Sequence, residues 1–185
     1  MKRAIILMRA NNMDFVNGRL YFIKDEFFDH IGDKYLKANK EATQRPHYYA
    51  FKDDSTGLLW VIPCSSKIDK YKNIIQQKIE NHKKHAHIQI IKVNGIEEAF
   101  LFQDMFPIME EYILNPYIKQ NVFMEIKDVK KLENIKKNAK NIIELMRHGV
   151  KFTPTQPDAM RIESILIKEL EAAQKEIAAS NKDTN

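Results

Sequence analysis

The chain has 185 residues, of which 44% are hydrophobic and 30% charged, with a formal net charge of +5. This size and composition indicate one globular domain with its own core. They argue against a membrane-spanning or disulfide-stapled protein, because no apolar run is long enough and Cys64 is the only cysteine. A lone cysteine fits the reducing cytoplasm, which is the expected location.

The first half of the chain predicts three strands and a short helix. Residues 18–24 form the first expected strand, and a short helix capped by Asp25 follows it. Residues 46–52 and 58–63 are typical of two further strands. The sequence DDSTG at 53–57 has the turn chemistry to join them in a hairpin.

An amphipathic helix is expected next, between about residues 67 and 85. Lysines cover most of it, and its apolar positions recur at helical spacing: Ile68, Tyr71, Ile74, Ile75 and Ile79. The dipeptide Asn94-Gly95 then predicts a hairpin between residues 87–93 and 96–103. Residues 105–113 and 121–127 add short strands.

Two helices are expected at the C-terminal end. Asp128 would cap the first, Gly149 would end it, and the second would run from about Pro157 to Ala179. Hairpins followed by helices indicate an α+β fold: a compact twisted antiparallel sheet or partly open barrel surrounded by helices, with a C-terminal helical pair. The predicted organisation is an N-terminal extension, a single domain and a disordered tail, over residues 1–13, 14–179 and 180–185.

The strand at 58–63 ends in Cys64-Ser65-Ser66-Lys67. From the residues alone the favoured interpretation is a helix cap, in which a serine hydroxyl accepts a free backbone N–H. The functional interpretation is an anion site, where a hydroxyl and an ammonium beside a helix N-terminus bind a phosphodiester. Both can hold, because one serine can cap while the other faces a ligand.

A second polar cluster, in the segment QRPHYY, lies where the first hairpin strand starts. The imidazole of His47 suits proton transfer, the guanidinium of Arg45 suits phosphate, and the ring of Tyr48 can stack on a base. The simpler interpretation makes His47 a satisfied residue at the sheet edge and places Tyr48 and Tyr49 in the core. The hairpin, however, brings the distal ends of its strands together, so we expect Arg45 and His47 beside the serine pair.

Lysines gather in the helix that follows the serine pair and again in the first C-terminal helix. Such faces attract polyanions, although a solvated helix face is the more ordinary interpretation. His82, His85 and His87 lie among these lysines with no carboxylate or thiolate close by in the sequence, so we expect no metal site. Glycine-rich nucleotide-binding loops are absent.

Four segments in order, GRLYFIKDEFFDHI, RPHYYAF, WVIPCSSK and FLFQDMFPI, resemble the ToxN/AbiQ/CptN family of type III toxin–antitoxin endoribonucleases, and the CptN-like branch most. The resemblance spans about residues 18–170. It implies a β-core like that of MazF/Kid toxins. It implies cleavage of adenine-rich single-stranded RNA, without metal or cofactor, to a 2′,3′-cyclic phosphate and a 5′-hydroxyl. The implied partners are a repeated pseudoknot RNA antitoxin, which the toxin processes and holds in a closed assembly, and cellular or phage messenger RNA.

In this resemblance the family's serine pair falls on Ser65 and Ser66, with Ser66 at the key position. Some members have one residue between the serine and the next lysine, but here Lys67 follows at once. Lys67 is therefore the expected lysine and Lys70 the alternative. The position after the proline, a lysine in some members, is His47 here.

The implied reaction uses the 2′-hydroxyl of the RNA as nucleophile. Ser66 would position that hydroxyl or the phosphate, Lys67 and Arg45 would stabilise the phosphorane, and His47 would be base or acid. The side chains expected to bind RNA are Arg45, Tyr21, Tyr48, Lys70, Lys72, Lys78, Lys83 and Lys84. Two alternatives stay open: a non-catalytic RNA-binding module, and a basic domain that binds an acidic protein.

Overall fold

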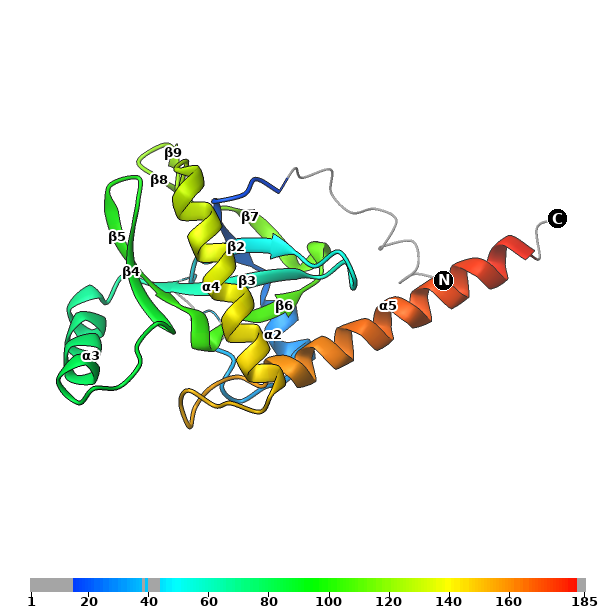
Figure 1. Ribbon diagram of the computed structural model, residues 1–185. Helices are drawn as coiled ribbons and strands as arrows, with labels where there is room; N and C mark the ends of the chain where they lie inside the picture. Colours follow the sequence, from blue (N-terminus) through cyan, green and yellow to red (C-terminus); the bar gives the residue numbers. More distant parts are fainter. Residues whose placement is uncertain (1–14, 38, 40–43, 183–185) are drawn as a thin grey trace.

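The computed structural model describes residues 15–37, 39 and 44–182 (Figure 1). The predicted extension at 1–13 and the last tail residues, 183–185, lie outside the described residues. The strands are β1 (Leu20–Ile23), β2 (His47–Lys52), β3 (Leu59–Ser65), β4 (Ile88–Val93), β5 (Ile96–Leu101), β6 (Phe106–Ile108), β7 (Ile113–Pro116), β8 (Ile118–Lys119) and β9 (Val122–Phe123). The helices are α2 (Asp25–Ile31), α3 (Ile68–Glu80), α4 (Val129–Arg147) and α5 (Ala159–Lys182), with the 3₁₀ turns η1 (Phe102–Asp104) and η2 (Glu110–Tyr112).

The main sheet is antiparallel and open. Its strands follow the order β4-β5-β3-β2-β1-β7, and β6 pairs with β3 outside this path. β8 and β9 form a separate small hairpin. Because β4 and β7 are the ends of the sheet order, the sheet does not close into a complete barrel. The predicted α+β fold, with an antiparallel sheet and a C-terminal pair of helices, is confirmed.

The central strand, β3, is buried along its whole length. It pairs with β2, β5 and β6. Trp60 and Ile62 pack with the apolar side of α4, whereas Leu59 and Val61 pack with α2 and the first turns of α5. A strand covered on both faces explains why this segment is a continuous apolar run in the sequence rather than an alternating one.

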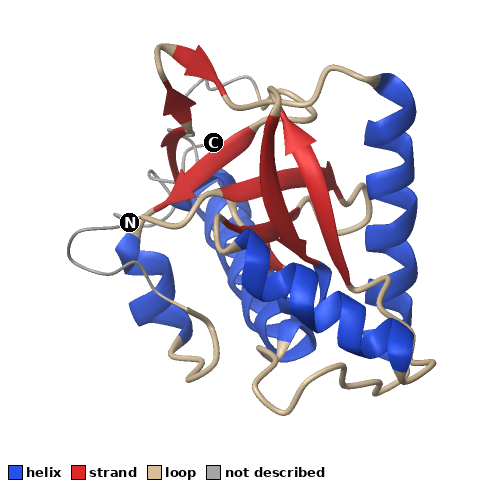
Figure 2. Ribbon diagram, turned by 90° about the vertical axis from the view of Figure 1, so that its left-hand side faces the viewer, coloured by secondary structure: helices blue, strands red, loops and turns tan. Residues whose placement is uncertain are grey.

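Helices cover the two faces of the sheet. Figure 2 shows the strands between α4 on one side and α2 on the other. α3 packs against β4 and β5 with its predicted apolar stripe, except for Ile79, which is 48% exposed. α5 packs beside β6 through Ile162 and Leu166 and then extends beyond the body of the molecule (Figure 1).

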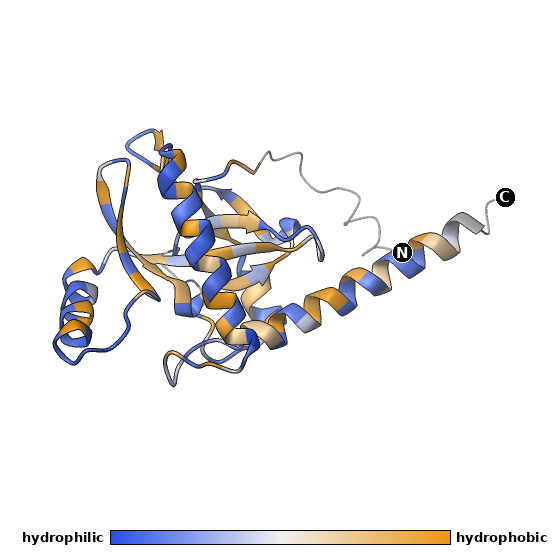
Figure 3. Ribbon diagram, viewed as in Figure 1, coloured by the Kyte–Doolittle hydropathy of each residue, from blue (hydrophilic) through white to orange (hydrophobic). Residues whose placement is uncertain are grey.

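The ends of α4 agree with the sequence. The Asp128 carboxylate accepts a hydrogen bond from the backbone N–H of Lys131 at 3.1 Å, which satisfies one free donor of the first turn. Gly149 follows the helix with φ of +80°, a conformation that glycine adopts without strain. Hydrophilic and hydrophobic bands alternate along α4 in Figure 3. Val129, in the first turn, is mainly exposed.

Two other helix boundaries differ from the expectation. Asp25 is not the cap of α2: Lys24 occupies the cap position and Asp25 is the first helical residue, where its charge still favours the positive end of the helix dipole. α5 begins at Ala159 rather than near Pro157, and it continues to Lys182. Local signals place helix ends to within a few residues, because neighbouring capping positions differ little in energy.

Candidate active site at the end of the β2–β3 hairpin

The β2–β3 hairpin brings the two polar clusters of the sequence together. His47 lies opposite Pro63 in the register, and the Cys64 N–H donates to the Pro46 carbonyl at 2.9 Å. This pairing sets Arg45, just before β2, beside Ser65 at the end of β3. Arg45 therefore lies beside the serine pair, as the sequence predicts.

The two serines have different environments. Ser65 is 9% exposed, and its Oγ accepts a hydrogen bond from the backbone N–H of Lys67 at 3.3 Å. Ser66 is exposed, and its hydroxyl has no hydrogen-bond partner among the described residues. Neither serine is the N-cap of α3, because Lys67 occupies that position without a side-chain cap. The hydroxyl of Ser66 is thus free to bind a ligand.

A pocket of about 390 Å³ opens at this end of the hairpin. It is lined by Lys37, Gln44, Arg45, Pro46, Cys64, Ser65, Ser66, Lys67, Lys70 and Tyr71. Four of these side chains are cationic and none is a carboxylate. Together with the N-terminus of α3, the pocket has the positive potential and the donors that an anion such as a phosphodiester requires.

Tyr71 lines the pocket, and Asp104 lies behind its cationic side chains without lining it. Burial raises the pKa of the Tyr71 phenol, and a hydrogen bond with the Ser65 side chain opposes this shift. Burial also raises the pKa of the Asp104 carboxyl, while Lys37 and Arg45 lower it. Both residues therefore lie within electrostatic range of Arg45, and Tyr71 keeps its proton at neutral pH.

His47 does not line this pocket. It is 1% exposed, and its ring packs against Phe28 and Phe106, with centroids 6.3 and 5.5 Å away. Burial first, and then the charge of Arg45, lowers the pKa of His47 to about 3. Its place near the serine pair agrees with the sequence. Its expected role as a proton-transfer group does not, because the imidazole is neutral at physiological pH and enclosed by core residues.

The two tyrosines expected to bind RNA also lie in the core. Tyr21 and Tyr48 are each 1% exposed. The Tyr21 hydroxyl accepts the backbone N–H of Val16 at 2.9 Å, and the Tyr48 ring packs against Phe100. Their aromatic faces are occupied by protein atoms, so both are structural residues in this fold.

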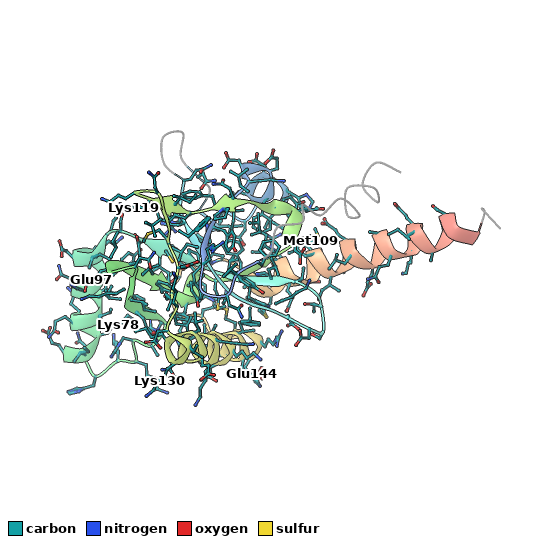
Figure 4. The ribbon with its side chains drawn as sticks, turned by 90° about the horizontal axis from the view of Figure 1, so that it is seen from above. Lys78, Glu97, Met109, Lys119, Lys130 and Glu144 are labelled. Atoms are coloured by element: carbon teal, nitrogen blue, oxygen red, sulfur yellow. The ribbon has the colours of Figure 1, made fainter. Side chains whose placement is uncertain are left out.

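The lysines of α3 divide into two groups. Lys67 and Lys70 line the pocket, as the sequence suggested for either of them. Lys72 is exposed but forms an ion pair with Glu97 at 2.7 Å. Lys78 lies in the last turn of α3, Lys83 and Lys84 follow the helix, and none of the three lines the pocket. Figure 4 labels Lys78 and Glu97 in this region of the molecule. These lysines are available to RNA only beyond the pocket itself.

The sequence interpretation missed several lining residues, among them Lys37 and Tyr71. Lys37 lies in a polar, irregular segment where no periodicity assigns a direction to the side chain. Tyr71 was assigned to the apolar stripe of α3, which is correct for its ring, but it also borders the pocket. Only the folded path of the chain brings these residues to the serine pair.

The part of the chain that the structure describes contains no group of three His, Cys, Asp or Glu side chains that could hold a metal ion. In that same part, no helix combines the length and the apolar character needed to cross a membrane.

The fold is similar to that of AbiQ, a lactococcal anti-phage endoribonuclease belonging to the type-III toxin–antitoxin system. The similarity covers 84% of this chain and 99% of the AbiQ chain, with a TM-score of 0.65 and 11% sequence identity. No protein-family model and no curated protein sequence matches the chain. At this identity the likeness establishes a shared α+β fold.

Proposed function

We propose that this chain is an endoribonuclease toxin of the type III toxin–antitoxin class, which cuts single-stranded RNA in the pocket at the end of the β2–β3 hairpin. The observation that carries the proposal is the convergence of Ser65, Ser66 and Lys67 with Arg45 and Lys37 in one cationic pocket. The fold shared with AbiQ, itself an anti-phage endoribonuclease, supports it.

The reaction that fits this pocket is transesterification by the 2′-hydroxyl of the RNA, which leaves a 2′,3′-cyclic phosphate and a 5′-hydroxyl. The exposed Ser66 hydroxyl hydrogen-bonds the 2′-hydroxyl or the phosphate. Lys67 and Arg45 stabilise the charge of the phosphorane. The lining suits chemistry without a metal ion, because cationic side chains repel a divalent cation and no carboxylate is among them.

Proton transfer falls to groups that border the pocket rather than to His47. Tyr71 is the candidate acid, because its phenol is protonated at neutral pH and donates to the leaving 5′-oxygen as negative charge develops there, while the proton of the attacking 2′-hydroxyl passes to solvent water at the pocket mouth. Lys67 and Lys70 complete the set of nearby proton donors.

The proposed partners follow from the same class. A repeated pseudoknot RNA would act as antitoxin, would be processed by the toxin and would be held in a closed toxin–RNA assembly, while cellular or phage messenger RNA would be the target. We propose adenine-rich sequences as the preferred substrate, a cytoplasmic site of action, and the CptN-like branch as the nearest group.

The decisive experiment compares the wild type with Ser66→Ala on adenine-rich single-stranded RNA in the presence of EDTA. The control is Ser164→Ala, which removes an exposed serine hydroxyl from α5, far along the chain from the pocket. We expect the wild type and the control to release products with a 2′,3′-cyclic phosphate. We expect Ser66→Ala to lose about 10²-fold or more of the rate, the usual cost of one transition-state hydrogen-bond donor.

A second candidate function, a non-catalytic RNA-binding module, is favoured by the same cationic pocket. RNA that is bound but never cut by the wild type would select this alternative. If RNA is neither bound nor cut, the basic domain that binds an acidic protein becomes the better interpretation.

A further inference from the structure

A second pocket lies at the opposite end of the β2–β3 hairpin. It has a volume of about 450 Å³ and is formed between the hairpin turn and one flank of α4. Its lining includes the buried aromatic residues Phe51 and Trp60, which face each other across the hairpin register. The α4 flank contributes Lys136, Lys140 and Arg147. No part of this pocket belongs to the candidate active site.

Several charges around this pocket already have partners. Arg147 contacts Glu163 at 3.0 Å and Asp53 at 3.9 Å. Lys52 pairs with Glu110 at 2.9 Å. Asp53 also accepts hydrogen bonds from the backbone N–H and the hydroxyl of Ser55. These contacts fix the wall of the pocket but leave little charge for a ligand.

Lys136 and Lys140 are different, because neither has a carboxylate within ion-pair distance among the described residues. Their Nζ atoms lie over the Phe51 ring, 6.0 and 5.5 Å from its centroid. Glu144, one turn beyond Lys140, contacts His148 Nδ1 instead, at 3.5 Å. Asp54, at the exposed turn, has no ion-pair partner in the described chain, and the Glu144–His148 contact is an ion pair only when His148 is protonated.

Two ammonium groups four residues apart on one helix flank repel each other. Lys136 and Lys140 keep this repulsion in the folded chain, where both ammonium groups lie over the Phe51 ring. One anion bound between the two groups would relieve it. The pocket is larger than a single phosphate needs. Elsewhere on α4 three more lysines, Lys130, Lys131 and Lys137, outnumber the one nearby carboxylate, Glu133. Lys130 and Glu144 mark the two ends of α4 along the margin of the molecule in Figure 4.

We propose that the α4 pocket is a second RNA-binding site, in which a backbone phosphate binds between Lys136 and Lys140. This inference rests on the proposed function, because it takes RNA as the ligand. The active-site pocket supplies chemistry, whereas this site supplies affinity. A strand held at both sites gains from effective concentration, so its binding exceeds that of either site alone.

The single tryptophan of the chain makes the test direct. Trp60 lines this pocket and is absent from the lining of the active-site pocket. Trp60 is 0% exposed, so its emission reports a bound phosphate through the change in electric field and packing at the pocket wall. The probe is an adenine-rich oligonucleotide with 2′-O-methyl groups, which lacks the nucleophile and is not cut by 2′-hydroxyl attack.

The experiment titrates the wild type and the double variant Lys136→Gln/Lys140→Gln with this probe over a range of salt concentrations. The matched control is Lys168→Gln/Lys175→Gln, which removes the same charge from exposed positions of α5. We expect Trp60 emission to change on binding. We expect the double variant to bind about tenfold more weakly at 0.15 M salt and its salt slope to fall by about 0.7, because one phosphate contact of a single strand is lost.

Three outcomes overturn the inference. If the double variant binds like the control and Trp60 emission does not respond, while RNA is still cut, only this second site is wrong and the proposed function stands. If no RNA is bound or cut at all, both proposals fail together. If poly-glutamate changes Trp60 emission and RNA does not, the pocket binds an acidic protein segment instead.

Discussion

Ser65 and Ser66 are adjacent in sequence but differ in what their hydroxyls contact. Ser65 Oγ accepts the Lys67 N–H, whereas Ser66 Oγ has no partner in the described chain. We expect Ser65→Ala to lower the free energy of unfolding by about 0.5–1.5 kcal/mol, the net value of one hydrogen bond. Ser66→Ala should leave it unchanged within about 0.5 kcal/mol. Urea denaturation of both variants measures this, and an equal loss in both would contradict it.

The buried His47 should make the stability of the protein depend on pH. Its pKa is about 3 in the folded chain against an ordinary value of 6.5. Between these values the unfolded chain binds more protons, so stability is complete above pH 6.5 and falls as the pH drops below it. His47 alone therefore costs about 2 kcal/mol of stability at pH 5, at about 1.4 kcal/mol per pH unit.

The measurement is urea denaturation of the wild type and of His47→Leu at pH 7.5 and pH 5. Leucine fits the apolar surroundings of Phe28 and Phe106 and cannot be protonated. We expect the loss of stability between the two pH values to be about 2 kcal/mol smaller in the variant. Since every other titrating group is present in both proteins, equal losses would mean that His47 titrates normally.

The residues of the site show what sequence alone can and cannot predict. Arg45 and Ser66 were predictable as neighbours because the hairpin that joins their strands is a local structure. Lys37 was not, because its position depends on a loop path that no pattern encodes. The failures at Tyr21 and Tyr48 have another cause: aromatic residues suit both a core and a base-stacking surface, and only burial separates the two.

At the scale of elements, the hairpins and the capped helix α4 follow from local chemistry. Asn94 and Gly95 have φ values of +46° and +81°, which a two-residue hairpin turn requires. The pairing of β3 with β5 and β6 rests instead on contacts between segments far apart in sequence, which strand patterns do not specify.

Gly18 is the tightest point between elements. Its φ is +90°, and a Cβ there would collide with the Ile126 carbonyl oxygen and lie 2.8 Å from Leu132 Cδ2. Gly18→Ala should cost about 3–5 kcal/mol of stability, from left-handed backbone strain and from the overlap. The control is Gly57→Ala, at φ +74° with no atom within 4 Å, which should cost about 1–2 kcal/mol. Thermal or urea unfolding measures both losses of stability. Equal losses in the two variants would contradict the close contact between Gly18 and Ile126.

In the whole molecule, the first turns of α5 pack against the core, whereas its last turns extend away from the body of the protein (Figure 1). Its contacts with the core involve residues up to Leu170, and the turns beyond it are mostly exposed. We expect removal of residues 172–185 to shift the melting temperature by less than about 2 °C, because exposed positions contribute little to stability. Removal from residue 162 should unfold the domain, since Ile162 and Leu166 are fully buried. Calorimetry measures the melting temperature of both truncated proteins. Equal melting temperatures would contradict the different contributions of the two parts of α5.

β3 would also set where the proposed cleavage of RNA occurs. One end of this strand reaches the serine pocket and the other reaches the pocket beneath α4, and the strand between them is buried on both faces. Trp60 and Ser65 are about 17 Å apart, from a rise of roughly 3.3 Å per residue. A separation set by a core strand cannot change while the domain stays folded. An RNA that occupies both pockets would then be cut at a constant number of nucleotides from its held phosphate, so length would select the scissile bond alongside base identity.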